Sequence, residues 1–192
     1  MDDRDYKLNL TISDFEQSME MLRHYDSFHW DITKFCFGQI CVVIGACWYI
    51  YERSLNNSTG KLIDCNLLIG ILLALSALFT LLCILSLLRN RTYFCKVSHY
   101  INEHRNNAIK ENTFGFENKS NMWTDENLPK PIDWLSTQFL SIYLLAVCMV
   151  VSACYAVYCI ADVEYRVFLV ILSCLLTLGI FIWLSYLILR DS

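Results

Sequence analysis

Four long stretches without a charged residue constrain this chain more than any other feature. They cover residues 35–51, 66–88, 135–160 and 167–189. Three of them exceed the roughly 20 residues that an α-helix needs to cross about 30 Å of hydrocarbon, and residues 30–33 can lengthen the first. Helices of a soluble bundle show a polar face, and these stretches have none. We therefore predict an all-α fold, an integral membrane four-helix transmembrane bundle with a cytoplasmic N-terminal helix extension. The predicted spans are about 31–51, 66–88, 135–160 and 167–189.

Lysine and arginine predict the orientation of these spans, because positively charged segments stay on the cytoplasmic side. The segments that would share a side with the N-terminus hold twelve of the 15 Lys and Arg residues, and the other side holds three. Both termini are therefore predicted to be cytoplasmic. The predicted parts are a cytoplasmic N-terminal segment with an amphipathic helix, a bundle that includes a cytoplasmic loop, and a cytoplasmic tail, at 1–34, 35–189 (loop 89–134) and 190–192.

The N-terminal segment has the pattern of a helix that continues into the first span. Ser13-Asp14-Phe15-Glu16 is a capping-box pattern, which predicts a helix start at Asp14. An apolar stripe with spacings of three and four follows, and we expect it to pack on neighbouring helices. Its members are Met21, Tyr25, Phe28, Ile32 and Phe35.

The second connection is predicted to be half helical. Apolar residues from Val97 to Ile109 keep helical spacing, so the second span is expected to extend inward. The composition turns polar and irregular over 112–131, which predicts a loop. Asp133 is then the expected N-cap of the third span.

The spans carry small and weakly polar residues that allow two interpretations. They let helices approach closely and bridge them by hydrogen bonds, which is ordinary packing. Alternatively, they line a mildly polar water-filled path that has no charge ring to select ions. The absence of ionisable residues at mid-membrane argues against active transport. The candidate pore-lining or packing residues are Gln39, Gly45, Thr137, Ser141, Cys148 and Ser152.

Ionisable groups crowd the start of the first span in HYDSFHWDITKF, residues 24–35. A solvated collar that fixes the depth of the helix explains them, with a tryptophan as interfacial anchor. In an oligomer the same residues would form a ring that binds a partner or gates a pore, and histidine would make it sensitive to pH. The candidate gate or partner collar comprises His24, Asp26, His29, Trp30, Asp31 and Lys34.

Signatures of catalysis and of cofactor binding are missing from the sequence. It has no phosphate-binding glycine loop, His-Glu-x-x-His, Gly-x-Ser-x-Gly or Cys-x-x-Cys motif. We predict that the protein is not an enzyme and uses no cofactor. The histidines are paired at a spacing of five, about 140° apart on a helix, so no metal site is predicted. The net charge of −4 argues against direct nucleic-acid binding.

The stretch MEMLRHYDSFHWDITKF at 19–35, which leads directly into a short four-span bundle, resembles small membrane effectors of bacterial anti-phage defence. The membrane components of the Hailong and Kiwa systems are such proteins. The resemblance implies a homo-oligomer in the bacterial inner membrane, held quiet by a cytoplasmic partner and released on infection to depolarise the cell. It carries over no individual gating residue.

Two functional hypotheses follow for a protein embedded in the lipid bilayer. The first is an oligomeric channel or pore-forming effector in antiviral defence, gated by a cytoplasmic regulatory protein or small ligand. The alternative is a non-conducting membrane scaffold or sensor that recruits a cytoplasmic partner protein.

Overall fold

The computed structural model describes residues 3–56, 62–110 and 136–190, and this described part of the chain is all-α. Each of its four helices contains a segment long and apolar enough to cross a membrane. At 1.5 Å per residue the first two, of 54 and 49 residues, are about 80 Å and 74 Å long, more than twice the thickness of the hydrocarbon layer. The helices are α1 (Asp3–Asn56), α2 (Leu62–Lys110), α3 (Thr137–Ile160) and α4 (Arg166–Arg190).

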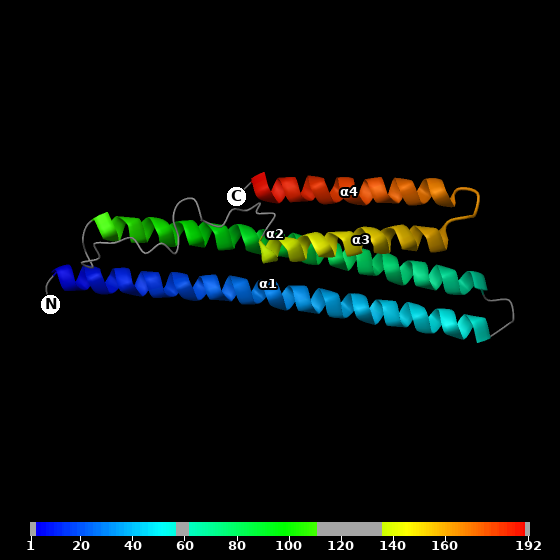
Figure 1. The fold of residues 1–192 in the computed structure, drawn as a ribbon, viewed down its shortest axis with the longest axis horizontal. Helices are drawn as coiled ribbons and strands as arrows, with labels where there is room; N and C mark the ends of the chain where they lie inside the picture. Colours follow the sequence, from blue (N-terminus) through cyan, green and yellow to red (C-terminus); the bar gives the residue numbers. More distant parts are fainter. Residues whose placement is uncertain (1–2, 57–61, 111–135, 191–192) are drawn as a thin grey trace.

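Helices α1 and α2 lie side by side and antiparallel, and we call this pair the hairpin (Figure 1). Helices α3 and α4 cover only one half of its length. The first turn of α3 meets α1 at Asp26 and α2 at Arg91. We call the part of the hairpin beyond this level the stalk: residues 3–25 of α1 and 92–110 of α2. It extends about 34 Å past α3.

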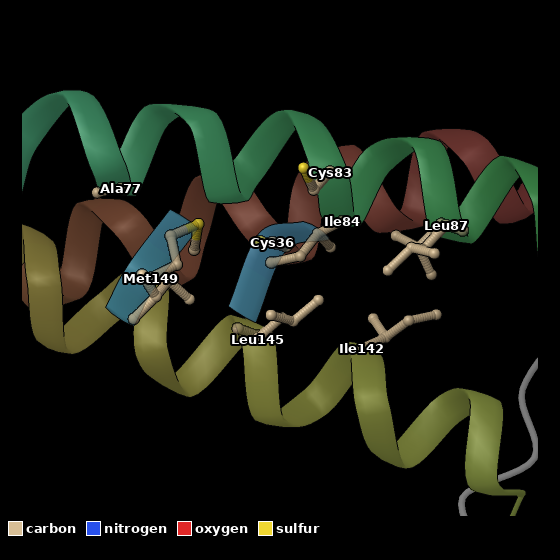
Figure 2. Packing of buried hydrophobic residues seen from close by; sticks show 11 residues of the cluster. Cys36, Ala77, Cys83, Ile84, Leu87, Ile142, Leu145 and Met149 are labelled. Atoms are coloured by element: carbon tan, nitrogen blue, oxygen red, sulfur yellow. The ribbon is translucent and has the colours of Figure 1, made fainter. Parts of the chain in front are cut away.

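The apolar core lies where α3 covers the hairpin (Figure 2). Ile142, Leu145 and Met149 project from α3 toward α2, and Cys36 of α1 lies beside them. The buried residues of this cluster are Cys36, Ile40, Ala77, Cys83, Ile84, Leu87, Leu88, Ile142, Leu145, Ala146 and Met149.

Near the opposite end of the hairpin from the stalk, α2 and α3 approach most closely at Gly70. A Cβ atom placed there would lie 2.8 Å from Cδ1 of Ile160 and 3.1 Å from the carbonyl oxygen of Ala156. Any larger residue would therefore push the two helices apart. Helix α4 packs more loosely, because none of its described side chains is buried.

Helix boundaries depart from the predicted ones in two places. The predicted start at Asp14 is wrong, because α1 already begins at Asp3 and Ser13 lies within it. A capping box favours a helix start but does not interrupt a helix where no Pro or Gly breaks it, and neither occurs in α1 before Gly38. The N-cap of α3 is Ser136, whose Oγ accepts a hydrogen bond from the backbone N–H of Phe139 at 3.2 Å. The expected cap, Asp133, and the predicted loop lie outside the described residues.

Two further predictions concern the stalk. The helical extension of the second span beyond Leu88 is confirmed, since α2 runs unbroken to Lys110. Its cytoplasmic location stays a prediction. The packing stripe on α1 is only partly right: Tyr25 and Ile32 are half-buried against the neighbouring helices. The other three members, Met21, Phe28 and Phe35, are 51%, 43% and 65% exposed. The face that packs on the neighbouring helices is instead a mixed one. Its buried residues are Ser18, Leu22, His29, Thr33, Cys36 and Ile40.

Candidate functional site

Polar residues from three helices meet around the first turn of α3, near the start of the first predicted span and the end of the second. Five of the six are buried, and the sixth, Asp26, reaches into the cluster from α1. Buried polar atoms destabilise a protein unless they are hydrogen-bonded, so the partners of each define this site. We call the cluster the polar network; it consists of Asp26, His29, Asn90, Arg91, Gln138 and Ser141.

Gln138 links a cation to an anion at the centre of the polar network. Arg91 Nη1 donates to Gln138 Oε1 at 2.5 Å, and Gln138 Nε2 donates to Asp26 Oδ1 at 2.6 Å. Hydrogen bonds with a charged partner are roughly twice as strong as neutral ones. The three side chains therefore hold α2, α3 and α1 together in one chain of contacts. The guanidinium of Arg91 can be buried, with the residue only 3% exposed, because Gln138 connects it to the carboxylate of Asp26.

His29 is fully buried beside these three side chains, and its hydrogen bond to Ser141 fixes the tautomer of the neutral ring. Ser141 Oγ donates to the carbonyl oxygen of Gln138 at 2.7 Å, so it accepts from Nε2–H of His29 at 2.8 Å. The other ring nitrogen, Nδ1, is buried and has no partner among the described residues. Burial, reinforced by the positive charge of Arg91 and opposed by Asp26, lowers the pKa of His29 to about 4. The ring is therefore neutral near pH 7.

Polar contacts between α1 and α2 continue from the polar network into the span. Asn90 Nδ2 donates to the carbonyl oxygen of Tyr25 at 2.8 Å. Farther along, Gln39 Nε2 donates to Ser76 Oγ at 3.1 Å. These contacts attach the two helices of the hairpin to each other. Together with the apolar cluster they fill the space between α1, α2 and α3, so the described part of one chain encloses no polar path there.

The predicted pore-lining or packing residues fall in different environments. Ser141 is buried in the polar network, and Gln39 is half-buried against α2. Cys148 and Ser152 are half-buried, whereas Gly45 and Thr137 are exposed. They do not share one face within a chain. A role for any of them in lining a path between copies stays a prediction.

The predicted collar is likewise divided. Asp26 and His29 point toward α3 and belong to the polar network, whereas the other four residues are exposed. Asp31 and Lys34 form an exposed ion pair of 3.9 Å, which contributes little to stability. The exposed members are His24, Trp30, Asp31 and Lys34.

Arg91 and Asn90 are the members that sequence reasoning misses. Both follow the charge-free stretch that ends at Leu88, where a basic residue is read only as a marker of orientation. The sequence does hold one indication of them: Asn90 and Arg91 continue, at helical spacing, the face of the second span that turns toward the core. Within the described ranges, no group of three His, Cys, Asp or Glu side chains is placed to hold a metal ion.

Comparisons with protein-family models, with curated proteins and with solved structures find no match to this chain.

Proposed function

We propose that the chain is one subunit of a homo-oligomeric membrane channel or pore-forming effector, gated from the cytoplasmic side by a partner protein or small ligand. The polar network carries this proposal, because it connects the stalk to α3. A movement of α1 against α2 in the stalk would have to break the charge-assisted hydrogen bonds of Gln138. Such a group of contacts, made or broken together, is the kind of element on which a two-state gate depends.

Several copies are needed because the space between α1, α2 and α3 of one chain is filled, and the cavity between α2, α3 and α4 is lined almost wholly by apolar residues. The three-helix core leaves no polar path among the described residues, so water and ions would pass between subunits. The four stretches 35–51, 66–88, 135–160 and 167–189 carry no charged residue, which suits weakly selective conduction and hence membrane depolarisation. The resemblance of residues 19–35 to defence effectors supports a place in the bacterial inner membrane, with both termini cytoplasmic and infection as the trigger.

The stalk favours a second candidate function. It extends about 34 Å beyond α3 and presents exposed side chains along both of its helices (Figure 1). A two-helix arm of this length is suited to recruiting a cytoplasmic partner. The protein would then be a non-conducting membrane scaffold or sensor.

Conductance distinguishes the two functions. The purified full chain, fused into planar bilayers of phosphatidylethanolamine and phosphatidylglycerol, should show rare openings. Gln138→Leu removes the hydrogen bonds to Arg91 and Asp26. It should raise the open probability about tenfold, because destabilising the closed state by about 1.4 kcal/mol shifts the equilibrium by that factor. The matched control is Tyr143→Leu, at an exposed position five residues farther along α3, which should leave openings unchanged. Silence of both variants and of the wild type would favour the scaffold.

A further inference from the structure

The two sides of the hairpin differ in what covers them. Residues two positions apart on a helix project about 160° apart. On α1, Asp26 bonds to α3, so Phe28 projects away from it. On α2, Arg91 bonds to α3, so Tyr93 projects away from it. We call the side covered by α3 the closed side and the opposite one the open side.

Aromatic residues of both helices meet on the open side. The rings of Tyr25 and Tyr93 are stacked, with centroids 6.0 Å apart and planes inclined by 13°. The rings of Phe35 and Phe79 meet edge to face at 5.8 Å. Phe28 lies between these pairs on α1 and is substantially exposed. The described residues of the chain leave this aromatic surface uncovered.

The open side also has a continuous row of residues along α2. Their spacing alternates between four and three, and all are exposed or half-buried. The row extends about 37 Å, more than the roughly 30 Å of hydrocarbon in a bilayer. Its members are Leu75, Phe79, Leu82, Ser86, Arg89, Tyr93, Lys96 and Tyr100.

Lipid cannot cover the whole of this surface. An interfacial aromatic belt explains a ring at the level of the headgroups, such as Tyr93. Tyr100 lies about 18 Å beyond Leu88, the end of the second predicted span, and Met21 lies about 15 Å before residue 31. Both are exposed on the stalk, where no lipid tail reaches. An apolar surface that crosses the membrane boundary needs a protein partner that crosses it too.

We propose that the open side binds the open side of a second copy of the chain, so that two hairpins form a four-helix bundle through the membrane and the stalk. This proposal rests on the homo-oligomeric part of the proposed function. Copies in one membrane share an orientation, so a two-fold axis along the bundle places α1 of each chain against α2 of its partner, antiparallel as in the hairpin itself.

The charges along the edges of the open side suit this pairing. Asp31 lies between Phe28 and Phe35 at spacings of three and four, on the same face of α1. The row on α2 carries Arg89 and Lys96. In the two-fold arrangement the carboxylate of one copy approaches the cationic row of the other, which favours α1 against α2 over α1 against α1.

Site-specific photo-crosslinking tests the interface. p-Benzoylphenylalanine replaces Phe28 in the full chain, reconstituted in vesicles of phosphatidylethanolamine and phosphatidylglycerol and illuminated. The matched control carries it at Trp30, an exposed aromatic residue on the same helix that projects away from the open side. We expect at least fivefold more covalent dimer from position 28. Mixing isotope-labelled and unlabelled chains should map the cross-links to residues 79–100 of the other copy.

Each other outcome overturns the proposal. Equal yields from the two positions, no dimer, adducts with lipid alone, or cross-links within one chain to residues 111–135 would each assign a different occupant to the open side. A probe at Phe35, also on the open side, guards against misfolding of a single variant. Conductance is scored separately: cross-linked dimers without current would refute the channel but keep the interface, and current without cross-links would do the reverse.

Discussion

The closed and open sides of the hairpin bury different kinds of side chain. The closed side buries an arginine, a glutamine and a histidine against α3, whereas the open side exposes stacked aromatic rings. This distribution of polar and aromatic side chains between the two sides is the one expected in a membrane. Lipid tails are as apolar as leucine, so apolar faces gain little by turning inward, while polar groups have no partner except another helix. Polarity, more than hydrophobicity, therefore selects the contacts within one chain.

The stalk extends the comparison beyond the lipid. Its internal face buries Leu22 and Ile101 but also Ser18, Ser98 and Asn102. Such a mixed interface buries little apolar area, so its hydrophobic stabilisation is small. A two-helix arm with a weak internal contact can shift without unfolding the bundle, which a gating element requires.

The largest expected effect on the closed side comes from removing its cation. Arg91→Leu leaves Gln138 Oε1 without its donor and the Asp26 carboxylate without a counter-charge, so the free energy of unfolding should fall by about 3 kcal/mol. Thermal unfolding in detergent, followed by circular dichroism, measures it. Arg23→Leu, at an exposed position of α1, is the control and should change stability by less than about 0.5 kcal/mol. Equal effects would mean that the polar network does not hold the helices together.

Two glycines sharpen the same contrast through packing. Gly70→Val drives a side chain into Ile160 and Ala156 of α3, and overpacking of this kind should cost about 2 kcal/mol. Gly45→Val is the control, because a Cβ there meets nothing within 4 Å. Both variants are measured by the temperature at which the detergent-solubilised protein aggregates. A larger loss of stability in Gly45→Val would show that α1 is packed more tightly at Gly45 than α2 is at Gly70.

The hydrogen bond between His29 and Ser141 should contribute less. Ser141→Ala removes the acceptor of a buried ring N–H, and we expect a loss of about 1.5 kcal/mol in the free energy of unfolding. Thr137→Ala, one turn earlier and exposed, should be nearly neutral. Denaturant unfolding of both variants provides the comparison. If Ser141→Ala is also neutral, the ring has found another partner.

How much of this could be predicted from the sequence depends on the kind of signal. The absence of charge over 66–88 and the other stretches predicts four membrane-spanning helices, and four helices long and apolar enough occur. The absence of Pro and Gly before Gly38 predicts the unbroken passage from stalk to span on α1. These signals are local, so one chain segment suffices to read them.

The polar network is not local, and the sequence indicates it only in part. Asp26 and His29 stand out as ionisable groups next to a span, but their partners on α2 and α3 are more than 60 positions away. No local pattern in the sequence pairs Arg91 with Gln138. The predicted packing stripe fails in part for a related reason: it assumes that the most apolar face of α1 turns inward, and polar partners on α2 and α3 select a face rotated from it.

Acidification should weaken the closed side selectively. The pKa of His29 is about 4 in the folded protein and near 6.5 when the chain is unfolded, so the unfolded state binds more protons between these values. Stability should therefore fall as the pH is lowered from 6.5 to 4, by at most about 1.4 kcal/mol per unit. Unfolding curves across this range measure the loss. His29→Gln should flatten the dependence of the free energy of unfolding on pH, whereas His99→Gln, at an exposed position, should leave that dependence unchanged. A slope that is the same in all three proteins would remove His29 as its cause.

The smallest expected effect on the fold lies on the open side. Phe28→Ala removes a ring that is 43% exposed and stacks on His24 of the same helix, so the free energy of unfolding in dilute detergent should change by less than about 0.5 kcal/mol. Leu22→Ala, a buried residue of the same helix, should cost about 2 kcal/mol. Calorimetry of both variants gives the contrast, and sedimentation in the same detergent gives their association state. A large loss from Phe28→Ala in particles shown to be monomeric would mean that the ring stabilises its own chain, and the open side would then be a part of the fold instead of a surface for a second copy.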